Sequence, residues 1–211
     1  MIDSITRNLT WLGHDAFCLE ADGTILYFDP FRLQGTLPKA DIILVSHEHY
    51  DHCSPEDIAK IRKPDTLIIT DQQAAAKLTG QVICLAPGES HTAGSIKIQT
   101  VPSYNTNKKF HPAANGWLGF IVTVKGVTIY HAGDTDRIPE MKTFKPDIAL
   151  LPVSGTYVMT AEEAAQAALD LQPALAIPMH YGSIVGEQAD AERFASLLTG
   201  KIPVTLLPLR S

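Results

Sequence analysis

The sequence predicts an α/β fold, in which two β-rich halves with helices on their outer sides form a four-layer αββα sandwich. Three observations predict it. Both halves of the chain contain short strand-like stretches that are bounded by turn residues. Segments with helix start signals follow or interrupt these stretches. The order of the expected elements is similar in the two halves, although no stretch of sequence is repeated between them.

Three strand-like stretches open the chain as an antiparallel sheet, at residues 8–12, 16–20 and 24–28. Asp22-Gly23 separates the last two and predicts a tight hairpin turn, because this dipeptide tolerates the positive φ angles that such a turn requires. The next strand, at residues 42–45, is entirely apolar, which is typical of a strand that is buried on both faces.

A helix, a strand and a second helix are expected after this apolar strand, at residues 55–62, 66–70 and 71–78. Ser54 is an N-cap residue, Pro55 suits the first helical position, and Asp57 stands where a capping box places an acid. Gly80 ends the second helix, since glycine adopts the left-handed conformation that commonly follows a helix. The order of these elements indicates βαβ architecture.

Strands in the second half are expected at residues 96–101, 119–124, 127–130, 148–152, 174–179 and 204–207. Lys125-Gly126 is the expected hairpin turn between the second and third of them. Helices are expected at residues 160–171 and 189–198, and Thr160 with Glu163 forms a capping box at the start of the first. The second half thus repeats the trend of the first, with helices between the later strands.

A chain of 211 residues is long enough for one well-buried domain, over residues 1–211, and short for two. The formal net charge of −6 at pH 7 gives no electrostatic reason to bind a polyanion, and no apolar run is long enough to cross a bilayer. Three widely spaced cysteines without a signal peptide favour the cytoplasm. We therefore expect a small-molecule substrate, no nucleic acid and no membrane as partners, and leave formation of a homo-oligomer open.

The strongest chemical signal is the segment His47-Glu48-His49-Tyr50-Asp51-His52, which directly follows the apolar strand. Imidazole and carboxylate groups suit zinc, manganese and iron, and four such ligand types occur within six positions. In extended backbone, His47 and His49 project to the same side, while Asp51 and His52 follow after the chain turns. One loop can thus provide ligands to two adjacent metal ions.

This pattern resembles the His-x-His-x-Asp-His signature of the metallo-β-lactamase superfamily. Gly133-Asp134-Thr135 is similar to that family's bridging-aspartate motif, and residues 178–182 are similar to its last-histidine motif. Residues 11–17 and 27–30 are similar to the branch that contains ascorbate-6-phosphate lactonase. The order and spacing of these motifs agree with the family along nearly the whole chain. The resemblance therefore implies the metallo-β-lactamase fold.

The resemblance also implies a set of metal ligands. They are His47 and His49 for a first metal ion, Asp51, His52 and His180 for a second, and Asp134 as a bridge between both. The cofactors would be two divalent ions, with zinc expected first and manganese or iron as alternatives.

The chain departs from the family at one position. Many members carry a further histidine for the first metal, where this sequence reads Tyr104-Asn105-Thr106. His111 is the preferred replacement, because its loop can fold back towards the cluster. His91 is the weaker candidate and is expected to be an exposed loop side chain. If neither histidine binds, Asn105 or water would complete the first site.

Five other residues near these motifs each have two interpretations. Asp29 accepts a hydrogen bond from a liganding imidazole, or it caps a turn. His14 lines the pocket or pairs within its turn, and His131 supports the ligands or is a buried, hydrogen-bonded histidine. Tyr157 hydrogen-bonds substrate, or it is a partly buried loop aromatic. Cys53 is expected to be a small buried thiol rather than a ligand.

The family's chemistry implies a hydrolase in which a hydroxide at the two metal ions cleaves a small ester, lactone, thioester or phosphodiester. Asp51, which can orient the hydroxide, is an expected catalytic residue together with Asp134 and Tyr157. The alternatives are a metal-binding protein without turnover and a di-iron protein that reduces oxygen or NO. The di-iron branch typically has glutamate at the position of His49 and an appended flavodoxin domain. This sequence shows neither feature, which disfavours the di-iron alternative. Nucleic-acid processing is disfavoured, because the chain has no clamp domain or long basic insertion.

Overall fold

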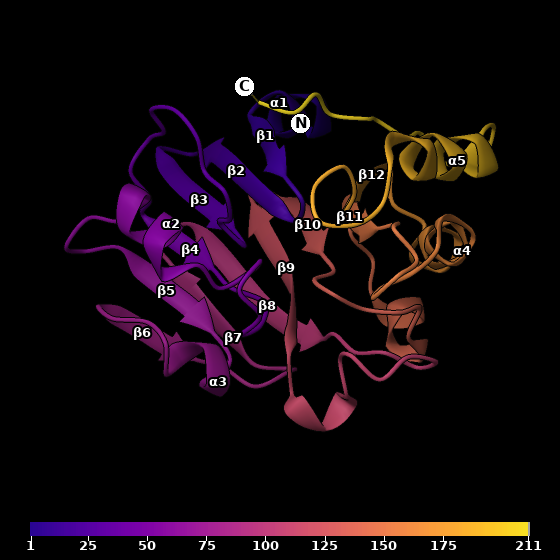
Figure 1. Cartoon of the computed structure of the whole chain (residues 1–211). Coiled ribbons are helices and arrows are strands. Elements are labelled where there is room, and N and C mark those ends of the chain that lie inside the picture. Colours follow the sequence, from indigo (N-terminus) through magenta and orange to yellow (C-terminus); the bar gives the residue numbers. More distant parts are fainter. Residues whose placement is uncertain (211) are drawn as a thin grey trace.

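A computed structural model describes residues 1–210 and contains two six-stranded sheets that pack face to face (Figure 1). In spatial order the first sheet consists of β1 (Leu9–Gly13), β2 (Ala16–Ala21), β3 (Thr24–Phe28), β4 (Ile42–Leu44), β5 (Leu67–Thr70) and β6 (Gln81–Cys84). The second sheet consists of β12 (Leu175–Met179), β11 (Ile148–Pro152), β10 (Val127–His131), β9 (Leu118–Val124), β8 (Ile96–Pro102) and β7 (Ser90–Ala93).

Each sheet is antiparallel in one part and parallel in the other. In the first sheet β1, β2 and β3 pair antiparallel, whereas β3 to β6 pair parallel. In the second sheet β7 to β10 pair antiparallel, whereas β10 to β12 pair parallel. Each sheet therefore presents the carboxyl ends of several parallel strands at one edge, which is where α/β proteins commonly place their ligands.

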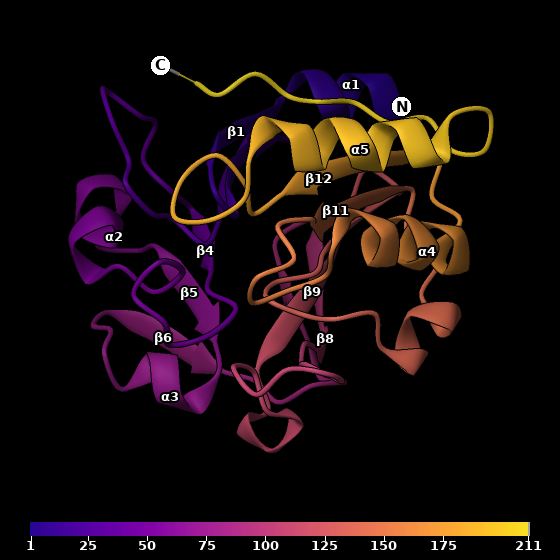
Figure 2. The same ribbon diagram turned by 45° about the vertical axis from the view of Figure 1, so that its right-hand side comes forward.

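Helices cover the outer faces of both sheets, as Figure 2 shows. The helices of the chain are α1 (Ile2–Arg7), α2 (Pro55–Ile61), α3 (Gln72–Ala75), α4 (Ala161–Leu171) and α5 (Gln188–Leu198), with short 3-10 helices at Ala113–Asn115 and Pro139–Thr143. α2 and α3 lie against the first sheet, and α4 and α5 against the second (Figures 1 and 2). The predicted four-layer αββα sandwich is thus confirmed. Within residues 1–210, every helix is too short or too polar to span a membrane.

Strand residues alternate between two hydrophobic cores. Phe28 and Leu44 point into the main core between the sheets, while Tyr27 and Ile43 point into a smaller core that includes residues of α2. Because neighbouring strand residues face opposite sides, this alternation fixes which face of the first sheet meets the second. Removing an aromatic side chain as large as Phe28 from water stabilises the fold by about 2–3 kcal/mol.

Three expectations about the elements were wrong or incomplete. Residues 204–207 form no strand, and only an isolated bridge joins Val204 to Ala176, because Pro203 and Pro208 cannot donate to a ladder. The helix expected at residues 71–78 ends at Ala75. α1, β6 and β7 were not expected. Both of these strands lie at sheet edges and are largely exposed, so they lack the apolar pattern of a buried strand.

Candidate metal centre

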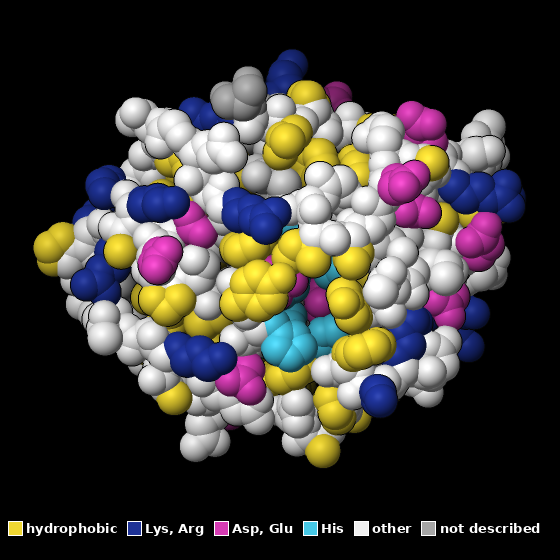
Figure 3. Space-filling model, in the orientation of Figure 1, with side chains coloured by type: hydrophobic (Ala, Val, Ile, Leu, Met, Phe, Trp, Pro, Cys, Tyr) yellow, Lys and Arg dark blue, Asp and Glu magenta, His cyan; other side chains and the backbone are white. Residues whose placement is uncertain are grey.

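The loops that follow β1, β4, β8, β10 and β12 meet at one edge of the two sheets. They carry the predicted ligands: His47, His49, Asp51 and His52 after β4, His111 after β8, Asp134 after β10 and His180 after β12. Figure 3 shows histidine side chains at the bottom of a hollow that is surrounded by apolar side chains. The loops after β1 and β4 come from the first sheet, and those after β8, β10 and β12 come from the second. The site therefore lies between the two halves.

Gly133 allows the loop after β10 to pack tightly. Its φ angle is +62°, and a Cβ atom at this position would lie 2.8 Å from the carbonyl oxygen of Leu118. A side chain here would therefore clash with backbone and strain the loop at once. This explains why glycine precedes Asp134 in the motif.

The first group of candidate ligands consists of His47, His49 and His111, whose nearest ring nitrogens all lie within 4.8 Å of one another. Nε2 of His47 is 3.0 Å from Nδ1 of His49. His47 and His111 are buried, whereas His49 is half-buried. His111, the preferred replacement for the missing histidine, therefore lies beside His47 and His49.

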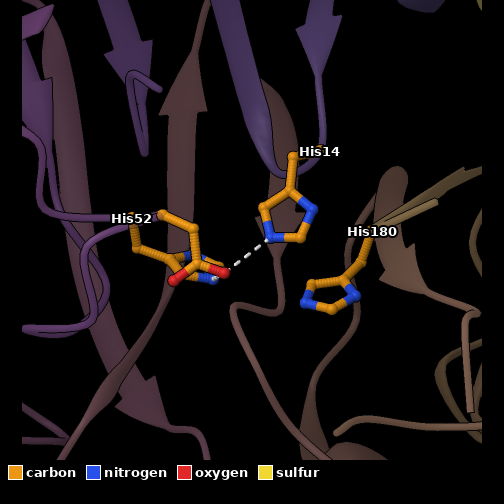
Figure 4. A group of neighbouring side chains, drawn as sticks. His14, His52 and His180 are labelled. Carbon is orange, nitrogen blue, oxygen red and sulfur yellow. Dashed lines mark hydrogen bonds and ion pairs between the residues drawn. The ribbon is translucent and has the colours of Figure 1, made fainter. Parts of the chain in front are cut away.

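The second group consists of Asp51, His52 and His180, and their ligand atoms, with one from His14, also lie within 4.8 Å of one another. Figure 4 shows His14, His52 and His180 converging from three separate segments. His52 and His180 are fully buried, and the Asp51 side chain is 14% exposed. The predicted second-metal ligands are thus brought together by the fold.

Asp134 lies between the two groups. Its Oδ2 atom is 3.1 Å from Nε2 of His111, which belongs to the first group. Its Oδ1 atom is 3.3 Å from Nε2 of His52 and 3.3 Å from Nε2 of His180, which belong to the second. One carboxylate therefore faces both groups, with a different oxygen towards each.

The inner atoms of this centre are buried without hydrogen bonds. Nε2 of His52, His111 and His180 and Oδ1 of Asp134 are inaccessible to solvent and have no hydrogen-bond partner. Such orphaned polar atoms are rare in folded proteins, because their desolvation is not compensated. Imidazole nitrogens and carboxylate oxygens are also the donors that zinc, manganese and iron accept. The residues therefore fit divalent metal ions, which would satisfy these atoms.

In each buried histidine of the two groups, the Nδ1 atom points away from the centre and contacts a protein oxygen. The Nδ1 contacts are His47 with Ser46 Oγ at 2.9 Å, His52 with Asp29 Oδ2 at 2.9 Å, His111 with Asn105 Oδ1 at 3.2 Å and His180 with Ser154 Oγ at 2.8 Å. Contacts of this kind fix the tautomer and the ring orientation of metal-binding histidines. They leave every Nε2 atom directed inward. Of the two interpretations of Asp29, the structure agrees with the hydrogen bond to the imidazole of a candidate ligand.

The charges of the centre favour cations. Burial opposes ionisation of Asp134, but the neighbouring His180 and His52 hold the pKa of its carboxyl group well below the usual value. Burial also opposes ionisation of Asp51, yet the hydrogen bond from His14 helps to lower its pKa to about 2. Burial lowers the pKa of His47 well below its usual value, which keeps this imidazole neutral. Two anionic carboxylates and a neutral imidazole are the protonation states that bind metal.

Other residues singled out from the sequence lie outside the two groups. His91 lies on the edge strand β7, paired with Ile98, and is not the exposed loop residue that was expected. His131 is buried, with Nε2 2.9 Å from the carbonyl oxygen of Asp15, which matches the interpretation as a hydrogen-bonded core histidine. Tyr157 is half-buried, and its ring packs edge-on against Phe110 with 4.8 Å between the centroids.

Three supporting residues have roles that the sequence did not reveal. Asn105 accepts hydrogen bonds from His111 and donates one to the carbonyl oxygen of Tyr157, so it anchors a histidine rather than facing the centre. Ser46 and Ser154 were missed. Their signal is only positional, because each follows the carboxyl end of a buried strand close to the candidate ligands.

Cys53 is buried, and burial raises the pKa of its thiol to about 11, as expected of a structural cysteine.

Comparisons with known proteins point to one family. Residues 8–180 match the family described as the beta-lactamase superfamily domain. The chain is 34% identical to a UPF0173 metal-dependent hydrolase from Methanoculleus marisnigri, over 94% of this chain and 92% of the relative. Among solved structures, a candidate metal-dependent hydrolase from Parabacteroides distasonis is 38% identical, with a TM-score of 0.86 over 96% of this chain and 93% of that one.

A metallo hydrolase from the archaeon Ignicoccus hospitalis is 26% identical, with a TM-score of 0.77 over 96% of this chain and 95% of that one. The similarity therefore extends over nearly the full length of these proteins. The residues that match the family include all of the candidate ligands, from His47 to His180. The chain belongs to the beta-lactamase superfamily and is one of its metal-dependent hydrolases.

Proposed function

We propose that this hydrolase binds two divalent ions, zinc by preference, one at each group of candidate ligands. The proposal depends above all on Asp134, because its two carboxylate oxygens face different groups at 3.1 and 3.3 Å. A carboxylate in that position can bridge two ions, whereas a mononuclear site would leave one set of buried nitrogens without a partner. The substrate would be a small ester, lactone, thioester or phosphodiester.

Ions held there would lower the pKa of a bound water towards neutrality and polarise a substrate oxygen. The chain itself offers Asp51 for the proton of that water, because this carboxylate is ionised and reaches the solvent-exposed side of the centre. Cys53 is a poor alternative nucleophile, since its thiol is buried and has a pKa raised to about 11. The attacking group is therefore proposed to be water.

Aromatic side chains surround the entrance to the centre. Tyr50 and Phe110 are two of the four exposed large hydrophobic residues among residues 1–210, and each is the neighbour of a candidate ligand. The ring of Tyr157 packs edge-on against that of Phe110, and we propose that Tyr157 contacts the substrate. A small organic substrate suits such an entrance.

The test begins with elemental analysis of protein purified without added metal, followed by hydrolysis assays on lactones, thioesters, esters and phosphodiesters. We expect about two ions per chain, and activity that a chelator removes and zinc, manganese or iron restores. Fewer than one ion per chain would exclude a dinuclear centre. Two ions without turnover of any compound would instead support a metal-binding protein that is not catalytic on these substrate classes.

A further inference from the structure

His14 has a left-handed backbone in the two-residue turn that joins β1 to β2. Seven non-glycine residues among residues 1–210 have positive φ angles, and three of them, Asp22, Lys125 and Gln172, lie in hairpin turns or at the end of α4, away from the centre. The other four are His14, Asp29, Arg32 and His180, which all lie at or next to the candidate centre. Strain that clusters in this way is held by the surrounding structure and commonly has a functional reason.

Two hydrogen bonds hold His14 in this conformation. Its carbonyl oxygen accepts one from Nε1 of Trp11 at 2.9 Å and one from the backbone N–H of His180 at 3.1 Å. His180 has a φ angle of +60°, so two left-handed histidines are joined directly through their backbones. This joins the loop after β1 to the loop after β12, and with it the two sheets.

The side chain of His14 contacts each member of the second group. Its Nε2 atom is 3.2 Å from Oδ2 of Asp51, and its ring centroid is 4.1 Å from that of His180 and 5.3 Å from that of His52 (Figure 4). His14 is only 1% exposed, so these contacts are made away from solvent. A change at His14 would therefore reach the whole second group.

The hydrogen bonds of His14 are the reverse of those made by the candidate ligands. His52, His111 and His180 each anchor Nδ1 on a protein oxygen and direct an unpartnered Nε2 inward. In His14, Nε2 contacts the Asp51 carboxylate, while Nδ1 is buried without a partner. A carboxylate accepts only from N–H, so the single proton of a neutral imidazole must be on Nε2. That nitrogen then has no lone pair for a metal.

We infer that His14 is a positioning residue of the second metal site, which donates its Nε2–H to Asp51 and packs against His180 without binding the metal itself. This inference rests on the proposed binding of an ion by the second group. Without this donor, Asp51 would lose the only side-chain hydrogen bond recorded for it within residues 1–210 and could rotate towards solvent.

The test compares two variants of the full chain, His14→Gln and His14→Asn. A glutamine amide places an N–H close to the position of Nε2, whereas the shorter asparagine places one close to Nδ1. Asparagine tolerates the left-handed backbone of residue 14, so loss of binding in His14→Asn cannot be attributed to backbone strain. His91→Asn on edge strand β7 is the matched control.

Metal-free protein is titrated with Zn²⁺ by calorimetry, and the thermal unfolding of each variant is recorded. We expect His14→Asn to weaken the binding of one zinc ion by about 10–100-fold, with the other ion unaffected. His14→Gln should recover most of that loss, and His91→Asn should match the unsubstituted protein.

Equal zinc affinities in His14→Asn and the unsubstituted protein would overturn the positioning role. Complete loss of one ion at saturating zinc in both variants would also overturn it, because His14 would then be a ligand. If the unsubstituted chain binds fewer than two ions, the proposed dinuclear function fails, and the inference fails with it. If the chain binds two ions and only the variants behave differently from expectation, the proposed function stands.

Discussion

The two groups of candidate ligands differ in how firmly the fold holds them. In the second group, His52 and His180 are fully buried, and the buried carboxylate of Asp29 anchors His52. In the first group His49 is half-buried, and His111 lies on an irregular loop where the neutral amide of Asn105 anchors it. Hydrogen bonds to ionised groups are stronger than those between neutral groups. We therefore expect the second group to bind its ion more tightly, and the first group to be lost more easily.

The largest effect is expected from Asp134→Asn, because the carboxylate oxygens of Asp134 lie within 3.3 Å of histidine nitrogens in both groups. Replacing the carboxylate with an isosteric amide should lower the occupancy of both ions. It should also reduce kcat/KM by about a thousandfold, or about 4 kcal/mol of transition-state stabilisation. Elemental analysis and steady-state kinetics measure the two effects.

Asp147→Asn is the matched control for this variant, because Asp147 lies just before β11 and its carboxylate accepts hydrogen bonds from the backbone N–H and the hydroxyl of Thr128. Its metal content should be unchanged. If Asp134→Asn lost only one ion and kept the other at full affinity, Asp134 would belong to a single group and would not be a bridge.

The next prediction separates the two groups. His111→Ala should leave one tightly bound ion per chain, whereas His52→Ala should remove that tight ion and leave a weak one. The reason is that His111 belongs to the first group and His52 to the second, although both contact Asp134. Competition titration with a chromophoric chelator measures both affinities. Unchanged metal binding by His111→Ala would remove His111 from the ligand set.

Anchoring residues should show the same contrast with smaller effects. Asp29→Asn should weaken the ion of the second group by about 10–100-fold, because an outer carboxylate orients His52. Asn105→Ala should weaken the ion of the first group by about tenfold, the lower end of that range, because its amide is a neutral acceptor. The same competition titration ranks the two. A greater loss from Asn105→Ala than from Asp29→Asn would reverse the proposed order of the groups.

The fold was largely predictable because its signals are local. Asp22-Gly23 and Lys125-Gly126 both adopt the positive φ angles of tight hairpin turns, as their residue types predict. The alternation of burial along β8 also follows from the sequence, in which apolar and polar residues alternate. β6 and β7 could not be found in this way, because an exposed edge strand has no apolar face to reveal it.

The site was predictable only where its residues are neighbours in the sequence. His47, His49, Asp51 and His52 lie in one loop, whereas the place of His111 depends on distant contacts. The side chain of Asp136 accepts hydrogen bonds from the backbone of Thr106 and Asn107, and so fixes the path of the loop that carries His111. Nothing in the sequence pairs Asp136 with that loop. The placement of His111 beside the first group is therefore tertiary information, and its binding of a metal ion stays a prediction.

The smallest effects are expected at two serines. Their substitution also tests whether the two groups bind their ions independently. Ser154 contacts only His180 of the second group, at 2.8 Å. Ser46 contacts His47 of the first group at 2.9 Å and donates its hydroxyl to Asp29 at 2.7 Å, which in turn anchors His52. The loss of a hydrogen bond between a serine and a neutral imidazole should cost about 1 kcal/mol, or about fivefold in affinity. Ser154→Ala should therefore weaken the binding of the ion in the second group only. Ser46→Ala should weaken the binding of both ions, by similar factors. If Ser46→Ala affected only the first ion, the hydrogen bond to Asp29 would not couple the groups, and they would be independent sites joined solely by Asp134.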